Sequence, residues 1–175
     1  MTYLVTYLHD ELMLTLVGAG LAMTLTQFGG VMGRVMWGYV ADRWIKPLRM
    51  LSLLAITMSG TAMACAFFEV GTSALWFNAV LVVFGATAIG WNGVYLAEVA
   101  RQAPPGMASV ATGGTLAVTF LGVVFGSPLV GWISNATGTY RSGFIALSLL
   151  AFTCFSLLTW LSRGKKPPLE LKVPS

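Results

Sequence analysis

Residues 38–49 read GYVADRWIKPLR, a charged segment that interrupts two long apolar stretches. Its acid is Asp42. Four cations lie in this segment or just before it: Arg34, Arg43, Lys46 and Arg49. They are taken from only ten Lys and Arg residues in a chain of 175. So much charge in one place needs a reason, and the flanking sequence gives part of it.

The composition is that of an integral membrane protein. Hydrophobic side chains make up 57% of the chain, charged side chains make up 9%, and the mean hydropathy is +0.80. A soluble domain of this size has room for about one fully buried helix, whereas apolar stretches recur here along almost the whole length. The net charge of +4 does not call for a nucleic-acid partner, because its placement matters more than its sum.

Five windows are long and apolar enough to cross the hydrocarbon core, which takes about 20 helical residues. We expect spans at about 12–37, 50–68, 73–97, 107–133 and 143–161. The opening MTYLVTYLHDE is too short to span and is expected to be the last turns of another helix. The predicted fold class is an all-α integral membrane bundle over residues 1–163, with five full transmembrane helices plus a partial N-terminal one. A basic tail is expected at 164–175.

The cations indicate the orientation, because Lys and Arg accumulate in short cytoplasmic loops. Threading five spans puts nine of the ten on one side: Arg34, Arg43, Lys46, Arg49, Arg101, Arg163, Lys165, Lys166 and Lys172. We therefore expect a multi-pass protein of the plasma (inner) membrane, with an external N-terminus and a cytoplasmic C-terminus. The N-terminus has no basic region before an apolar core, so no removable signal peptide is expected. The cations near Asp42 are thus partly a topology signal.

Topology alone does not ask for an acid in this loop. The residues follow a spacing in which eight residues separate two glycines and three more precede the acid: Gly29, Gly38, Asp42, Arg43, Lys46 and Arg49. This pattern resembles the signature cytoplasmic loop of the major facilitator superfamily of secondary transporters. The family usually has a glycine between the Asp-Arg pair and the next base, where this chain has Trp44 and Ile45.

Two further stretches place the resemblance within the family's fold. NGVYLAEVARQAPPGMASVATGG (92–114) resembles the end of helix 10 and the start of helix 11, and GSPLVGWISNATGTYRSGF (126–144) resembles the link from helix 11 to helix 12. The signature loop occurs in the family after helix 2 and again after helix 8. The whole chain therefore resembles the C-terminal six-helix bundle, from the end of helix 7 through helix 12.

The resemblance implies a gating role for the signature loop. Transporters that rock two halves about a midplane site need contacts that hold in one state and break in the other. In the family the loop's acid braces the adjacent half, on a helix that this chain does not contain. Glu98 and Arg101, at the cytoplasmic end of the third span, join the candidate gate, and we expect Glu98 to pair with a cation of the loop: Arg34, Arg43 or Arg49. The alternative is solvated interfacial charges worth under about 1 kcal/mol.

Candidate solute-path residues lie in the third span, which corresponds to a path-lining helix of the family. Asn92 and Tyr95 are three residues apart and Trp91 and Tyr95 four apart, so they are expected on one helical face. An amide and two aromatic rings suit a small organic molecule. The alternative places the rings in an interfacial aromatic belt, with Asn92 bonded to a neighbouring helix. Weaker polar candidates are Gln27, Thr112, Thr115 and Thr119.

Small residues recur in the fourth span: Gly113, Gly122, Gly126, Pro128 and Gly131. They lie close to a glycine-proline pattern that some antiporter branches carry in helix 5, although Ser127 spoils the match. We expect helix packing, since small residues permit close approach and proline permits a bend, with a coupling motif as the alternative.

Catalytic, metal and cofactor sites are not expected. The single histidine, His9, stands beside Asp10 and Glu11 without a nucleophile near it in the sequence. Cys65 and Cys154 lie in apolar stretches without metal-ligand spacing. A membrane enzyme is therefore not predicted.

The sequence favours a secondary transporter that moves a small solute by alternating access, of which this chain resembles the C-terminal half. The expected partners are the lipid bilayer, the solute, and either the missing N-terminal half or another copy of the chain. The other hypothesis is a non-transporting membrane module, or a truncated fragment that associates with a partner half through its glycine-rich faces. Neither the substrate nor a coupling ion follows from the sequence.

Overall fold

The computed structural model describes residues 3–164, and every regular element in that range is an α-helix. The helices are α1 (Leu4–Asp10), α2 (Leu16–Arg43), α3 (Pro47–Ala66), α4 (Ala74–Ala88), α5 (Trp91–Gln102), α6 (Ala108–Thr137) and α7 (Arg141–Gly164). Five segments are long and apolar enough to cross a membrane, with α4 and α5 together forming one of them. The predicted fold class, five full membrane helices and a partial one before them, is confirmed.

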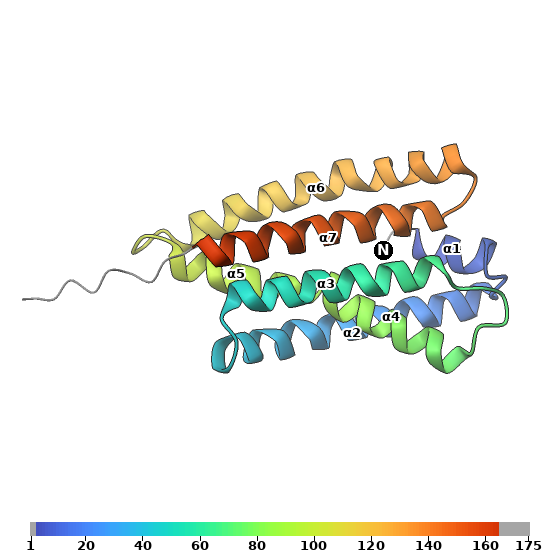
Figure 1. Cartoon of the computed structure of the whole chain (residues 1–175), viewed down its shortest axis with the longest axis horizontal. Coiled ribbons are helices and arrows are strands. Elements are labelled where there is room, and N and C mark those ends of the chain that lie inside the picture. The colour runs from blue at the N-terminus through green and yellow to red at the C-terminus, as the bar shows by residue number, and fades with distance from the viewer. Residues whose placement is uncertain (1–2, 165–175) are drawn as a thin grey trace, which may run out of the picture.

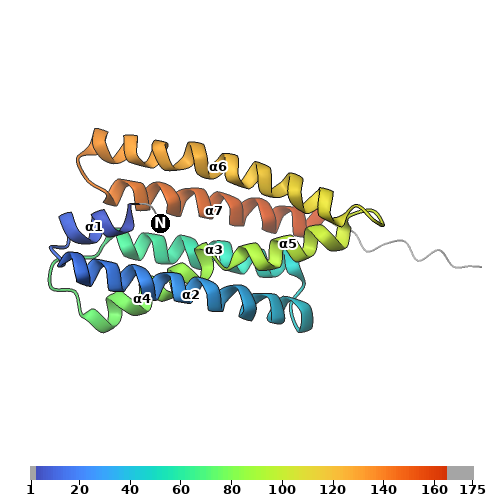
Figure 2. The same cartoon turned by 180° about the vertical axis from the view of Figure 1, so that it is seen from behind.

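The long helices run roughly parallel to one axis of the bundle (Figure 1). The α2–α3 turn and the α5–α6 loop lie at one end, while α1 and the α6–α7 turn lie at the other (Figures 1 and 2). The most extensive packing joins α3 to α7 and α2 to α4. Helix α6 lies at the outer edge beside α7 in both views, and Ser134 is its one buried residue. The fold thus brings the ends of α2 and α5 together.

Local sequence signals set several helix ends. The hydroxyl of Thr15 accepts a hydrogen bond from the Gly18 N–H at 3.1 Å and so caps the start of α2. Pro47 opens α3, at a position where its missing N–H has no helical partner to lose. Gly138 ends α6 in the left-handed region with φ of +70°, which costs a glycine little.

The helices extend beyond the predicted spans where charged side chains begin. The first span was expected to end at about 37, but α2 runs to Arg43, and the third was expected to end at 97, but α5 runs to Gln102. A charged side chain on the last turns reaches polar surroundings while its backbone keeps its helical hydrogen bonds. A hydropathy window therefore closes before the helix does. The tail expected at 164–175 lies, apart from Gly164, outside the described residues.

The third span is broken into two helices, which the hydropathy pattern does not indicate. Helix α4 ends at Ala88 and α5 begins at Trp91, with Gly90 between them. A methyl group on Gly90 would clash with Trp37 and Gly33 of α2. The break therefore lies where α2 presses against the third span, at a glycine that weakens the helix.

A partly buried network of hydrogen bonds closes the end of the bundle near α1. The hydroxyl of Tyr7 donates to the Cys65 carbonyl at 2.6 Å, and its ring packs on Phe144. The Glu11 carboxylate accepts hydrogen bonds from the Thr139 hydroxyl and the Tyr140 N–H. It also pairs with Arg141 at 3.5 Å, and Arg141 in turn donates to the Phe68 carbonyl at 2.9 Å. The residues before α2 are thereby attached to α3 and α7.

Candidate gate and solute path

A cluster of charged residues joins α2 to α5 at the end that carries the α2–α3 turn. The Arg101 guanidinium is hydrogen-bonded to the Asp42 carboxylate, 59 residues away in sequence. Arg101 also lies 3.8 Å from Glu98, whose other oxygen accepts from the Gln102 amide at 2.6 Å. The side chains of Asp42 and Arg101 remain 60% and 48% exposed. The cluster is therefore solvated, and its contribution to stability is small.

The contacts of Glu98 differ from the expected ones. Its partners come from its own helix, one turn further along, and the loop cations that the sequence analysis offered it do not reach it. Arg101 was not among the partners expected for Glu98. It lies three residues further along the same helix and was named only as part of the family pattern. Arg43, Lys46 and Arg49 have exposed side chains on the α2–α3 turn. No partner within the chain was expected for Asp42, but Arg101 forms an ion pair with it.

Glycines allow α2 to lie against the third span at backbone contact distance. A methyl at Gly29 would lie 2.6 Å from the Val82 carbonyl oxygen, and a methyl at Gly33 would lie 2.5 Å from that of Ala86. On the opposing side a methyl at any of three glycines would lie within 3 Å of an atom of α2: Gly85, Gly90 and Gly93. Gly38, by contrast, has no described atom within 4 Å of such a methyl. Gly29 therefore serves the helix contact, and no steric need for Gly38 is visible.

Two side chains of α2 bind carbonyl groups around the break in the third span. The Trp37 indole N–H donates to the Ala86 carbonyl at 2.8 Å, and the Arg34 Nε donates to the Ile89 carbonyl at 3.5 Å. Arg34 lies nine residues before the end of α2, about 14 Å inside the helix at 1.5 Å per residue. The sequence analysis counted Arg34 among the cytoplasmic cations, although it falls within the first predicted span of 12–37. In the structure it lies in the body of α2 and contacts the third span.

The aromatic pair of the predicted path lines a cavity of about 480 Å³ between α3, α5 and α7. The rings of Trp91 and Tyr95 lie 5.4 Å apart, and Glu98 lies on the same wall. Asn92 does not line this cavity, and its amide donates to the Ile89 carbonyl at 3.3 Å. Residues three apart on a helix diverge by about 60°, which is enough to separate Asn92 from the aromatic face here. The predicted path residues thus divide between two faces of α5.

The small residues of α6 find few neighbours in the described part of the chain. A methyl at Gly113, Gly122 or Gly126 would meet no atom within 4 Å, whereas one at Gly131 would strike the Tyr3 hydroxyl. Pro128 lies inside α6, which continues past it to Thr137. A packing role for this set stays a prediction. The hydroxyl groups of Thr112, Thr115 and Thr119 bond to carbonyls of their own helix, as membrane threonines commonly do.

Two polar contacts were missed at the sequence level. The pair between Glu11 and Arg141 joins residues that are 130 apart in the sequence. The only sequence signal for it was that the predicted orientation puts this acid and this base on the same side of the membrane. Arg34 was named only as a loop cation and possible partner of Glu98, and its contact with the Ile89 carbonyl was not expected. Among residues 3–164, groups of three or more His, Cys, Asp or Glu at metal-binding spacing do not occur.

Comparison with known proteins identifies the family. The model described as Major Facilitator Superfamily matches residues 1–115. The benzoate transport protein of Acinetobacter baylyi is 25% identical over 123 residues, covering 70% of this chain and 26% of the relative. Monocarboxylate transporter 13 of Rattus norvegicus is 24% identical over 175 residues, covering 90% of this chain and 40% of the relative. No solved structure matches the chain significantly.

The family match covers more than half of the chain, and it includes the signature loop, the glycine contacts of α2 and the broken third span. The chain spans less than half the length of either curated relative. Both relatives are named as transporters, in keeping with a multi-pass bundle of membrane helices. The resemblance seen in the sequence is confirmed, and the chain belongs to the major facilitator superfamily.

Proposed function

We propose that this chain forms part of a secondary transporter that moves a small organic acid by alternating access. The family and the two transporter relatives support transport in general. The relatives' names, benzoate and monocarboxylate, favour a substrate with one carboxylate. In this proposal the chain supplies one half of the solute path and a partner half supplies the rest.

The observation that carries the proposal is the position of Arg34. Charged side chains inside a membrane span are costly and, where present, commonly mark a substrate or ion pathway. Arg34 is exposed, lies about 14 Å inside α2, and contacts the break in the third span. A guanidinium binds a carboxylate through two parallel hydrogen bonds, which gives both affinity and orientation. In this account Arg34 anchors the carboxylate of the solute.

The charged cluster at the α2–α3 turn completes the proposed mechanism. In this account the ion pair between Asp42 and Arg101 holds the end of α2, with its signature loop, against the end of α5 while the two halves rock. We place this end in the cytoplasm, because Lys and Arg gather there. A membrane-impermeant thiol reagent applied to single cysteines at positions 46 and 69 tests that orientation.

The test is uptake of labelled benzoate into vesicles that contain this chain together with a polypeptide supplying the preceding helices of the family fold, hereafter the paired vesicles. We expect Arg34→Gln to abolish uptake and Arg34→Lys to retain a fraction of it, since lysine keeps the charge but loses the bidentate geometry. Lys172→Gln is the control, because it removes one cation at a position outside the candidate gate and path. Equal loss in both Gln variants would remove Arg34 from substrate binding.

One observation favours a second candidate, a membrane module that binds a partner without transporting. Helix α6 exposes large apolar side chains along its length, including Val118, Phe125 and Trp132. An apolar surface with glycines suits helix association in lipid. If the paired vesicles assemble a complex yet take up neither benzoate nor other small metabolites, this second function is the better account.

A further inference from the structure

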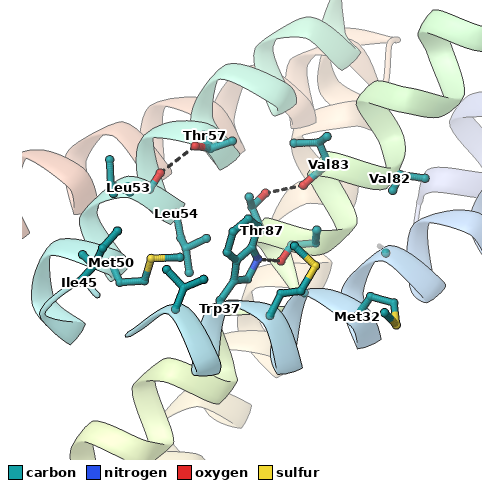
Figure 3. A pocket seen from close by; sticks show the side chains of 15 residues that line it. Met32, Trp37, Ile45, Met50, Leu53, Leu54, Thr57, Val82, Val83 and Thr87 are labelled. Atoms are coloured by element: carbon teal, nitrogen blue, oxygen red, sulfur yellow. Dashed lines mark hydrogen bonds between the residues drawn. The ribbon is translucent and has the colours of Figure 1, made fainter. Parts of the chain in front are cut away.

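A second cavity, of about 530 Å³, lies between α2, α3 and α4 close to the α2–α3 turn (Figure 3). Its walls include Met32, Met36 and Val40 of α2, Ile45 of the turn, and Met50 and Leu53 of α3. Trp91 and Tyr95, the aromatic candidates for the solute path, do not line it. The cavity is therefore distinct from the one lined by Trp91 and Tyr95, although Leu54 and Thr87 border both.

The polar groups in this cavity are already hydrogen-bonded. Thr57 donates to the Leu53 carbonyl at 2.8 Å, Thr87 donates to the Val83 carbonyl at 2.9 Å, and the Trp37 indole donates to Ala86 (Figure 3). A polar solute would find no free donor here and would lose its hydration. An apolar chain loses nothing, and the methionine side chains adapt to its shape. The lining thus selects an apolar occupant.

The cavity opens onto the outer surface of the bundle. Met32, Met36 and Leu53 are 46%, 49% and 49% exposed, and α2 makes little contact with α3. In a bundle that spans a membrane, an apolar outer surface meets the acyl chains of the lipid. The cavity is therefore an apolar groove that is open at the side of the bundle.

Cations stand at the end of the groove nearest the turn. In the sequence Ile45-Lys46-Pro47-Leu48-Arg49-Met50, the groove-lining Ile45 and Met50 enclose Lys46 and Arg49, both exposed. The nearest acid, Asp42, is occupied by Arg101. Within residues 3–164 no acid pairs with Lys46 or Arg49. The groove thus has an apolar body and a positively charged mouth.

We propose that this groove binds an anionic phospholipid from the leaflet next to the α2–α3 turn, with one acyl chain between α2 and α3 and the head group on Lys46 and Arg49. A zwitterionic lipid fills the same groove but carries a compensating positive charge, so the cations select against it. Each cation near an anionic lipid surface strengthens binding by about fivefold. The inference goes beyond transport and does not depend on it.

The test uses the full chain in phosphatidylcholine vesicles that contain a trace of phosphatidylglycerol with a photoactivatable diazirine in its acyl chain. A parallel sample carries the same diazirine in phosphatidylcholine. After illumination, mass spectrometry locates the adducts. We expect phosphatidylglycerol adducts to concentrate between residues 32 and 57, and phosphatidylcholine adducts there to be several-fold fewer.

Two variants separate the head-group and chain contributions. Lys46→Gln with Arg49→Gln should lower the phosphatidylglycerol adducts by about fivefold per cation removed and leave those of phosphatidylcholine unchanged. Leu53→Trp should fill the groove and lower both. The controls are Lys165→Gln with Lys166→Gln, which removes the same charge, and Leu149→Trp, the same bulk on the exposed surface of α7. Neither control should change the adducts.

Three results would overturn the proposal. Equal labelling of residues 32–57 by both lipids would show a groove without head-group selection. Unchanged labelling in the double Gln variant would remove Lys46 and Arg49 from the site. A dimer that excludes lipid from these residues, and that Leu53→Trp dissociates, would place a second copy of the chain in the groove instead.

Discussion

Asp42 and Arg101 provide the sharpest prediction at the scale of single residues. Both side chains are about half exposed, so their ion pair contributes under about 1 kcal/mol to stability. A larger effect of its removal on transport therefore reflects the mechanism. We expect Asp42→Asn and Arg101→Gln to insert and melt like the unaltered chain, while each lowers uptake in the paired vesicles by about fivefold or more, which corresponds to about 1 kcal/mol.

The charge swap is the control for that pair. Asp42→Arg combined with Arg101→Asp keeps the attraction and reverses its direction, so it should recover part of the lost uptake. Glu98→Gln keeps a hydrogen-bonding group 3.8 Å from Arg101 and should change uptake less. If the single variants transport normally, the pair has no part in gating.

Gly29 provides a second prediction at this scale. A methyl there would lie 2.6 Å from the Val82 carbonyl oxygen, and backbone cannot move aside as a flexible side chain does. We expect Gly29→Ala to destabilise the bundle by about 1–3 kcal/mol. The measurement is thermal unfolding in detergent. Gly60→Ala, in an exposed part of α3 with open space around it, should be neutral or slightly stabilising.

The roles and contacts of individual residues were predictable from the sequence to different extents. The spacing of Gly29, Asp42 and Arg43 was enough to identify the loop, because that pattern is local. The partner of Asp42 was not predictable, because Arg101 reaches it only through the packing of α2 on the third span. The contact of Arg34 with the Ile89 carbonyl was not predictable for a related reason, since it also depends on the packing of α2 on the third span.

At the scale of elements, a pair of serines holds α3 to α7. The Ser59 hydroxyl donates to the Ser148 carbonyl at 2.9 Å, the Ser148 hydroxyl donates back to the Ser59 carbonyl at 2.9 Å, and the two hydroxyl oxygens lie 3.1 Å apart. Interhelical bonds of this kind in membranes contribute about 0.6–2 kcal/mol. We expect Ser59→Ala and Ser148→Ala each to lower the unfolding free energy in detergent by that amount, and the double variant by less than their sum.

Ser52→Ala is the matched control for the serine pair. Ser52 is also buried in α3, but its hydroxyl bonds to the Leu48 carbonyl of its own helix at 3.0 Å. Its removal should cost little. Losses that are additive, or no larger than that of Ser52→Ala, would show that the pair does not bridge the helices.

The existence of the helices was predictable, and their interruption was not. Long apolar windows report how many segments cross the membrane, because each needs about 20 residues. The break at Gly90 follows from the close approach of Gly33 and Trp37, a contact between distant segments. The division of Trp91 and Asn92 between two faces of α5 follows from the helical period, but which of these faces lines a cavity depends on the packing of α3 and α7.

At the scale of the whole molecule, ion pairs lie at the two ends of the bundle, and exposed apolar side chains lie along its sides. One end carries the α2–α3 turn with its cations and the ion pair to α5, and the other carries the network of Glu11 and Arg141. The outer helix α6 buries a single residue within the chain. An element so little covered by its own bundle leaves an apolar face open, which agrees with the proposal that the solute path is divided between two halves.

The measurement that tests this account most directly is benzoate uptake by vesicles with the chain alone, compared with the paired vesicles at equal protein density. The account predicts uptake in the paired vesicles only, inhibited by unlabelled monocarboxylates and lost in Arg34→Gln. Uptake by the chain alone would contradict the division of the path between two halves. Absence of uptake in both, with the complex assembled, would contradict transport itself.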